Sequence, residues 1–205
     1  MQTLFLSMDD PQALDIAAKI LSDGGLVAFP TDTVYGLAAQ VFNDQAVSRI
    51  SDVKGRIVEK AIPILIGDYS QLPLVASEIN TECEKLASRF WPGPLTIVLP
   101  RHQSIPDAVT PLQTVGVRIP NFPATIELLK MTGPLAVSSA NKTGMNSSST
   151  ARGVQSQLDG KIALILDGGV TPGGIPSTVM DWTNGNPTIL REGPISLEQI
   201  MAALA

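Results

Sequence analysis

The sequence has very little cysteine and histidine, with one residue of each, Cys83 and His102, in 205 residues. A single cysteine excludes an internal disulfide and a zinc site built on cysteines. A Ser-His-Asp or Cys-His hydrolase also has almost no residues from which it could be assembled. We therefore expect Cys83 to be a small residue on a helix face, His102 to lie in a polar loop, and the chain to work in the reducing cytoplasm.

Long hydrophobic runs are also absent. No uncharged apolar run approaches the roughly 18 residues that a membrane-spanning helix needs. The first ten residues, MQTLFLSMDD, have no basic start and reach acidic residues at once, unlike a secretory signal. A hydrophobic fraction of 44% with 16% charged residues excludes a disordered chain. We expect one domain that spans residues 1–205 and has no membrane partner.

Positive charge is in deficit, because 14 Lys and Arg stand against 19 Asp and Glu and give a net charge of −5. The sequence pI is about 4.8. This balance argues against a surface dedicated to nucleic acid, although an acidic protein can still hold a local basic pocket. The positions of the basic residues therefore matter more than their sum.

The chain does contain a regular alternation of short apolar segments with amphipathic ones. Asp10-Pro11 is typical of a helix start, Asp44 can cap a second helix, and Asn184-Gly185 is typical of a turn between two strands. The predicted strands are 26–29, 62–66, 95–99, 115–119, 135–137, 162–166, 177–182 and 188–191. The predicted helices are 11–23, 44–53, 81–90, 123–131, 151–158 and one that begins at Ser196. This alternation predicts an α/β fold, and the adjacent final strands favour a mixed sheet.

Several predicted elements end in polar residues that a hydrophobic core does not need. They are Thr31 to Thr33, Lys54 with Arg56, Thr114 with Arg118, Ser139 with Asn141, Ser177 with Thr178, and Arg191. If these residues converge, they form a concave site with cations for phosphates and with hydroxyls and amides for a small polar ligand. The stretch 134–151, PLAVSSANKTGMNSSSTA, is equally consistent with a solvated serine-rich loop.

The candidate site lacks the residues of several common chemistries. Asp32 is the one carboxylate in a candidate motif, which argues against a glycosidase or a two-metal hydrolase. The sequence has no G-x-x-x-x-G-K-[ST] loop, and its Gly-Gly pairs at 168–169 and 173–174 do not form a dinucleotide fingerprint. A bound nucleotide must therefore be held in another way.

Seven short motifs make the sequence resemble the YrdC/TsaC family of threonylcarbamoyl-AMP synthases, in its short, single-domain form. They occur in the family's order and with similar spacing between about residues 24 and 194. The motifs are PTDTVYGL (30–37), KGR (54–56), WPGPLT (91–96), VRIP (117–120), SSAN (138–141), STV (177–179) and LREG (190–193).

The resemblance implies a twisted mixed sheet with flanking helices around a large basic cavity. It also implies a reaction in which L-threonine, bicarbonate and ATP give L-threonylcarbamoyladenylate and pyrophosphate. That product supplies the threonylcarbamoyl group of a modified adenosine next to the tRNA anticodon. Proteins that transfer this group would act downstream.

The resemblance further implies roles for individual residues. The catalytic residues would be Lys54 and Arg56. The threonine-binding residues would be Thr33, Arg118, Ser139 and Ser177. The ATP-binding residues would be Lys54, Arg56, Thr114, Asn141, Ser149 and Arg191. No metal site in the protein is implied, and Mg²⁺ would arrive with ATP, held largely by its phosphates.

Two other functions stay open at this point. One is a non-catalytic RNA-binding or ribosome-maturation factor of the same fold, which would bind tRNA or double-stranded RNA through a local basic patch. That patch would comprise Lys54, Arg56, Lys60, Lys142 and Arg152. The other is a paralogue that acts on a different small acceptor.

Overall fold

Short strands and amphipathic helices alternate along the chain, as the sequence predicts. The computed structural model describes residues 2–55 and 61–205. The strands are β1 (Leu4–Ser7), β2 (Val27–Phe29), β3 (Gly36–Gln40), β4 (Ile64–Leu65), β5 (Leu95–Pro100), β6 (Thr114–Arg118), β7 (Leu135–Ser139), β8 (Leu164–Asp167), β9 (Thr178–Asp181) and β10 (Thr188–Arg191). The helices are α1 (Ala13–Ser22), α2 (Asp44–Lys54), α3 (Thr81–Phe90), α4 (Pro123–Thr132), α5 (Ala151–Leu158) and α6 (Leu197–Leu204), with a 3₁₀ helix at Tyr69–Leu74.

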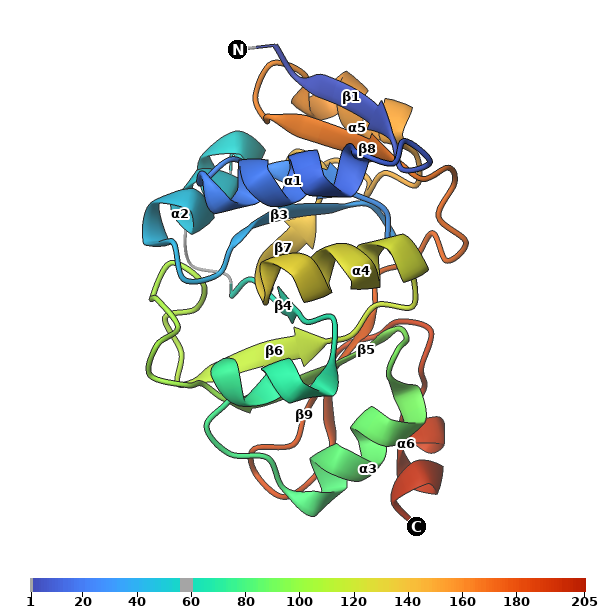
Figure 1. The fold of residues 1–205 in the computed structure, drawn as a ribbon. Coiled ribbons are helices and arrows are strands. Elements are labelled where there is room, and N and C mark those ends of the chain that lie inside the picture. Colours follow the sequence, from blue (N-terminus) through green and yellow to red (C-terminus); the bar gives the residue numbers. More distant parts are fainter. Residues whose placement is uncertain (1, 56–60) are drawn as a thin grey trace.

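The described strands form one ten-stranded sheet in the order β1-β8-β2-β3-β7-β4-β6-β5-β9-β10. Parallel and antiparallel pairs both occur, for example β4 with β6 and β5 with β6. The predicted α/β fold with a mixed sheet is therefore confirmed. Figure 1 shows the sheet running through the molecule from β1 and the N-terminus at one end to β9 and the C-terminus at the other.

Side chains alternate between the two faces of the sheet and so separate two hydrophobic cores. On one face, Val27, Phe29 and Leu135 pack under α1 and α4, which lie side by side across the strands (Figure 1). On the other face, Ala28 and Ala136 belong to the larger core, which also takes residues from α2, α3, α5 and α6. One sheet thus carries helices on both faces.

The face of the sheet that α1 and α4 cover is open to a cavity at β6 and β5. In β6, Val115 and Val117 point into the larger core. The alternate residues Thr114, Gly116 and Arg118 point to the cavity. In β5 the same alternation separates Ile97, in the core, from Thr96 and Val98. The outward residues line a cavity instead of packing under a helix, which explains why polar residues interrupt the apolar pattern of these strands.

Several predicted boundaries are wrong. Helix α1 begins at Ala13 rather than after Asp10, because the Asp10 carboxylate accepts a hydrogen bond from the Gln12 amide at 2.9 Å and closes a turn first. Helix α2 is capped by Asn43, whose side chain accepts from the Ala46 amide at 3.0 Å, and not by Asp44.

Two strands are absent from the prediction, and one predicted strand is reduced to two residues. β1 was not predicted because it pairs with β8, whose residues are about 160 positions away in the sequence. β3 was not predicted because it consists largely of small residues with weak strand preference. β4 keeps only Ile64 and Leu65 of the predicted 62–66. The helices at Thr81–Phe90 and Ala151–Leu158 and the strand at Thr188–Arg191 match their predictions, and Cys83 is buried on a face of α3.

Within the described residues, none of the helices combines the length and the apolar character that crossing a membrane would require.

Gly67 illustrates how closely the chain after β4 approaches α4. A Cβ on Gly67 would lie 2.7 Å from the Lys130 amide nitrogen and 2.8 Å from the Ile126 carbonyl oxygen. Both are backbone atoms of a helix, so they cannot move aside as a flexible side chain would. The close approach of the chain after β4 to α4 therefore requires glycine at this position.

We predict that Gly67→Ala lowers the free energy of unfolding by about 2–3 kcal/mol, because the added methyl overpacks a buried contact. The control is Gly185→Ala, where φ is +75° but no atom lies within 4 Å, so only backbone strain of about 1 kcal/mol applies. Urea unfolding of both variants measures the difference. Equal costs for the two variants would contradict the steric explanation.

Candidate functional site

A cavity of about 650 Å³ opens on the face of the sheet beyond α1 and α4. Alternate residues of β6 and β5 form its floor, and residues from β3, β7, β9 and β10 and from the end of α2 form its walls. Of the residues at 2–55 and 61–205, the cationic side chains of Lys54, Arg118 and Arg191 line it. Among the described residues, no carboxylate is part of the lining, so the cavity is suited to an anion.

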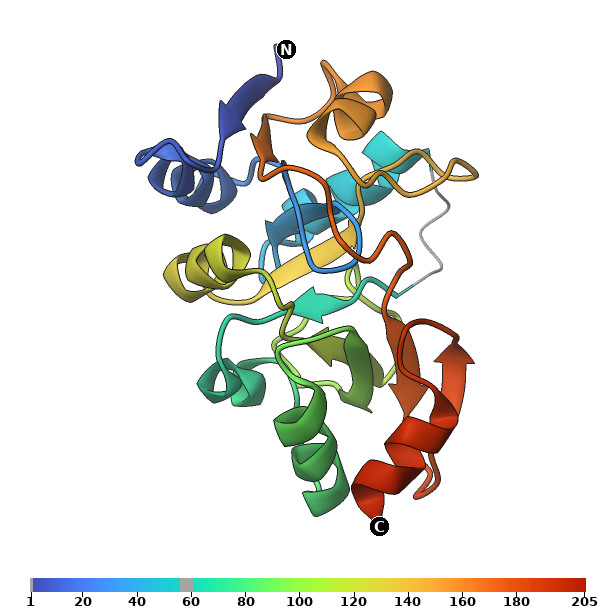
Figure 2. The ribbon, with the colours of Figure 1, turned by 90° about the vertical axis from the view of Figure 1, so that its right-hand side faces the viewer.

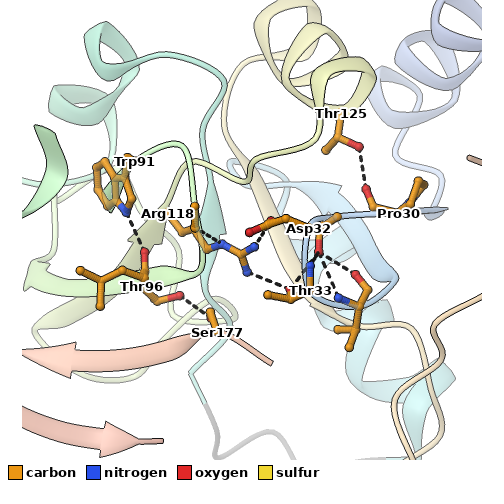
Figure 3. Close-up of polar contacts among 12 residues, drawn as sticks. Pro30, Asp32, Thr33, Trp91, Thr96, Arg118, Thr125 and Ser177 are labelled. Carbon is orange, nitrogen blue, oxygen red and sulfur yellow. Dashed lines mark hydrogen bonds and ion pairs between the residues drawn. The ribbon is translucent and has the colours of Figure 1, made fainter. Parts of the chain in front are cut away.

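The loop between β2 and β3 brings small hydroxyl groups to one wall of the cavity. The Thr31 hydroxyl donates to the Val34 carbonyl at 2.7 Å and accepts from the Thr33 amide at 3.1 Å, which closes a tight turn. The hydroxyls of Thr31 and Thr33 also lie 2.9 Å apart. Since both residues are buried, this turn fixes the Thr33 hydroxyl at the cavity wall (Figure 3).

Arg118, the last residue of β6, is held from three sides. Its Nε donates to the Gly93 carbonyl at 2.9 Å, one terminal nitrogen donates to the Thr33 hydroxyl at 3.1 Å, and the other forms an ion pair with Asp32 (Figure 3). Only 6% of the Arg118 side chain and 11% of the Asp32 side chain are exposed. A guanidinium has five N–H donors, so these contacts leave two N–H groups for a ligand.

The electrostatics of Arg118 reflect this burial. Desolvation lowers the pKa of Arg118, and the nearby charge of Arg191 acts in the same direction, whereas Asp32 opposes both. Because the positive charges of Arg118 and Arg191 repel each other, an anionic ligand would relieve that repulsion.

Ser177, directly before β9, forms hydrogen bonds with Thr96 and with Arg191. Its hydroxyl is 2.8 Å from the Thr96 hydroxyl of β5, and its carbonyl accepts from Arg191 Nε and from an Arg191 terminal nitrogen at 3.1 and 2.8 Å. The same terminal nitrogen donates to the Ser177 hydroxyl at 3.1 Å. In β10 the register shifts between Ile189 and Arg191, and this bulge allows Leu190 and Arg191 both to line the cavity.

Lys54 ends α2 and reaches the opposite wall. Gly55 in the left-handed conformation, with φ of +63°, terminates the helix there. The Lys54 ammonium donates to the Asn141 carbonyl at 2.8 Å and to the Ser139 carbonyl, with the Ser139 hydroxyl at 3.4 Å. The side chain is buried, so Lys54 does not belong to an exposed RNA-binding patch.

Asn141 presents an acceptor atom that has no partner among the described residues. Its side-chain nitrogen donates to the carbonyls of Lys142 and Met145 at 2.9 and 2.7 Å, which orients the amide. The buried Oδ1 then makes no hydrogen bond to any residue that the structure describes. A buried acceptor without a partner is unfavourable, so this atom is suited to a donor on a bound ligand.

The connection between β8 and β9, residues 168–177, passes along the cavity and is tied to it at several points. The Tyr35 hydroxyl donates to the Gly169 carbonyl at 2.7 Å and accepts from the Gly168 amide at 3.3 Å. Further along, the Gly174 amide donates to the Thr33 carbonyl at 2.8 Å. In Figure 2 this connection runs from β8 down to β9. These ties fix the position at which Ser177 enters the cavity.

The structure brings most of the predicted site residues together. The cavity lining includes Thr33, Lys54, Thr114, Arg118, Ser139, Asn141, Ser177 and Arg191. Ser149 is not part of the lining, and its carbonyl instead accepts from the Thr171 amide at 2.9 Å. Arg56 lies outside the described residues, as does Lys60 of the RNA-binding alternative.

Sequence reasoning assigned no role to Asp32, Tyr35 or Thr96. Asp32 and Tyr35 stand inside the PTDTVYGL motif, but their partners come from distant elements that no local pattern indicates. Thr96 could have been found, because it is a hydroxyl residue between the core residues Leu95 and Ile97 of a buried strand. In the part of the chain that the structure describes, no group of three or more His, Cys, Asp or Glu residues could hold a metal ion.

Tyr35 leads to a prediction on pH dependence. Burial raises the pKa of Tyr35 from 10.0 to about 12, with a smaller contribution from the charge of Asp167. The unfolded tyrosine therefore ionises near pH 10 while the folded one stays protonated. Compared with Tyr35→Phe, the wild-type chain should lose on the order of 2 kcal/mol of unfolding free energy between pH 10 and 12.

Denaturant unfolding at several pH values measures this difference. The control is Tyr69→Phe. Desolvation and the charge of Glu84 also raise the pKa of Tyr69, but Tyr69 is 40% exposed, so the change over the same range should be smaller. A constant difference between wild type and Tyr35→Phe from pH 9 to 12 would show that the Tyr35 hydroxyl is not sealed from water.

Comparison with known proteins places this chain in a defined family. The family model Sua5_yciO_yrdC, described as "Telomere recombination", matches residues 19–193. The threonylcarbamoyl-AMP synthase of Pyrococcus abyssi is 45% identical over 187 residues, which cover 90% of this chain and 55% of that protein. The threonylcarbamoyl-AMP synthase of Bacillus subtilis is 42% identical over 205 residues, which cover 97% of this chain and 58% of that protein.

A solved structure agrees with these relatives. The crystal structure of P. abyssi Sua5 complexed with L-threonine matches with a TM-score of 0.93 and 40% identity, over 99% of this chain and 61% of that one. The chain thus spans little more than half the length of these relatives. A match over residues 19–193 nevertheless includes nearly all of the sheet, and the chain belongs to the Sua5/YciO/YrdC family.

Proposed function

We propose that this chain synthesises L-threonylcarbamoyladenylate from L-threonine, bicarbonate and ATP. The observation that carries the proposal is the composition of the cavity. Lys54, Arg118 and Arg191 supply positive charge, Thr33 and Ser177 supply hydroxyls, and the described lining contains no carboxylate. Relatives at 42–45% identity bear the name of this activity, and the related P. abyssi structure is described as a complex with L-threonine.

The threonine end of the site centres on Arg118. Its two uncommitted N–H groups can bind a carboxylate, because three other contacts hold the guanidinium in place. The hydroxyls of Thr33 and Ser177 lie beside it, and Ser139 is on the neighbouring wall. These small polar groups suit the hydroxyl and the amine of threonine.

The reaction then needs two bond-forming steps. The threonine amine attacks bicarbonate, which forms an N–C bond and releases water, and the product is a carbamate. A carbamate oxygen next attacks the α-phosphorus of ATP, and the bond to the β-phosphate breaks to release pyrophosphate. No covalent bond to the protein is required.

Charge builds on the phosphate oxygens during the second step. Lys54, Arg191 and, outside the described residues, Arg56 would stabilise this charge more strongly in the transition state than in the ground state. Thr114 and Asn141 would contact the nucleotide, with the Asn141 Oδ1 accepting from one of its donors. Ser149 would contribute only through a movement that brings it to the cavity.

Mg²⁺ would come with ATP in this scheme. The described lining offers no carboxylate, and the nearby Asp32 is already paired with Arg118. The donor set therefore fits an ion held by the nucleotide phosphates better than one held by the protein. Its contribution would be to neutralise charge on the phosphates.

The use of the product is part of the same proposal. The adenylate is an activated acyl donor, so a protein that transfers the threonylcarbamoyl group to an adenosine of tRNA would consume it. The site of the reaction would be the cytoplasm.

Pyrophosphate release in the presence of ATP and bicarbonate tests the proposed function. Release should require L-threonine, and glycine should not replace it. A chain that binds ATP but releases no pyrophosphate with threonine would contradict the proposal and favour a non-catalytic RNA-binding protein. Release with another amino acid in place of threonine would favour a paralogue with a different acceptor.

We further predict that Arg191→Ala lowers kcat/KM for pyrophosphate release about 100-fold, the usual effect of removing one charge-stabilising donor. The melting temperature should fall by no more than a few degrees, because Arg191 is exposed at the rim of the cavity and only its hydrogen bonds to Ser177 are lost. The control is Arg89→Ala, which removes an exposed arginine of α3 away from the cavity. If both variants keep full activity, Arg191 has no role in the reaction.

A further inference from the structure

Thr96 and Ser177 form a buried pair of hydroxyl groups at the floor of the cavity. Their oxygens lie 2.8 Å apart, and the residues are 1% and 4% exposed. Thr96 comes from β5 and Ser177 from the end of the β8–β9 connection, so the contact joins two separate parts of the fold (Figure 3). The distance alone leaves open which hydroxyl donates.

The exposure of the two hydroxyls favours one direction. Among the described residues, Ser177 is the one hydrogen-bond partner of the Thr96 hydroxyl. Whichever hydroxyl donates, the proton of the other has no acceptor among the described residues. An unpaired buried polar hydrogen costs about 1–3 kcal/mol unless a ligand or water accepts from it. Ser177 is the more exposed of the two, at 4% against 1%, so its proton is the one that a ligand can reach and Thr96 is assigned as the donor.

The direction of this bond determines what Ser177 can offer a ligand. A hydroxyl has one donor hydrogen and two acceptor lone pairs. One lone pair of Ser177 accepts from Thr96, and the other accepts from the Arg191 terminal nitrogen at 3.1 Å. Both acceptor positions are thus filled by the protein. The Ser177 hydroxyl proton is then available to a ligand, because Ser177 lines the cavity.

We propose that Thr96 is a positioning residue that fixes Ser177 as a hydrogen-bond donor to an acceptor group of the amino-acid substrate. This inference rests on the proposed function. Ser177 then complements Arg118 and selects a carboxylate or hydroxyl oxygen at this point rather than an ammonium group. Thr96 acts on the substrate through Ser177.

Gly116 supports this arrangement from the neighbouring strand. A Cβ on Gly116 would lie 2.9 Å from the Thr96 methyl carbon, so a larger residue in β6 would displace the Thr96 side chain. Because Gly116 has no side chain, Thr96 can adopt the rotamer in which its hydroxyl contacts Ser177.

The test is the kinetics of pyrophosphate release by Thr96→Val, an isosteric change that removes the donor. The KM for L-threonine should rise about 10-fold, while the KM for ATP and kcat stay within twofold, because ground-state binding of the amino acid is affected. Thr96→Ser, which keeps the hydroxyl, should restore the KM for L-threonine to within twofold of wild type. Thr3→Val is the control, since it removes a buried hydroxyl that bonds Ile162 and Gly160 away from the cavity.

Each outcome is decisive. An unchanged KM for L-threonine in folded Thr96→Val, or an equal rise for both substrates, would overturn the inference. Failure of Thr96→Ser to restore threonine binding would also overturn it. If Thr96→Val does not fold, Thr96→Ala removes the same donor without adding bulk, and the same KM comparison applies. Wild-type chain that neither binds threonine nor releases pyrophosphate would overturn the proposed function itself.

Discussion

The site depends on the buried ion pair between Arg118 and Asp32. The sheet is narrowest at β4, where two residues connect β7 to β6. Asp32 follows β2 on one side of this narrow point, and Arg118 ends β6 on the other. Their contact therefore holds together the two parts of the sheet that form opposite walls of the cavity. Removing one partner of such a pair is expected to cost about 3–5 kcal/mol, because the remaining charge stays buried without compensation.

The remaining contacts of the site build on this pair. The Thr33 hydroxyl accepts a hydrogen bond from Arg118, and the Thr33 carbonyl accepts one from the Gly174 amide. These bonds fix the β2–β3 loop and the β8–β9 connection to each other. The connection delivers Ser177, which Thr96 and Arg191 then orient. A preformed set of donors of this kind needs little rearrangement when an anion binds, and such preorganisation is the main source of electrostatic stabilisation in enzymes.

The sequence predicted the fold class and most of the site because both depend on local patterns. The alternation in TVGVR places Val115 and Val117 in the core and leaves Thr114 and Arg118 for the cavity. The contacts that orient the site could not be predicted in this way. Asp32 pairs with Arg118, which is 86 positions away in the sequence. Lys54 donates to the carbonyls of Ser139 and Asn141, which are 85 and 87 positions away. The burial of Lys54 gives it a structural role that its position in the KGR motif does not reveal.

A crystal structure of this chain with bound L-threonine tests the central claim most directly. The account predicts that the threonine carboxylate lies within about 3.2 Å of the Arg118 guanidinium and that the Arg118 ion pair with Asp32 is kept. An acceptor oxygen of the ligand should also lie within hydrogen-bond distance of the Ser177 hydroxyl. Threonine bound elsewhere in the cavity, or an Arg118 side chain turned away from Asp32 to reach it, would contradict the account.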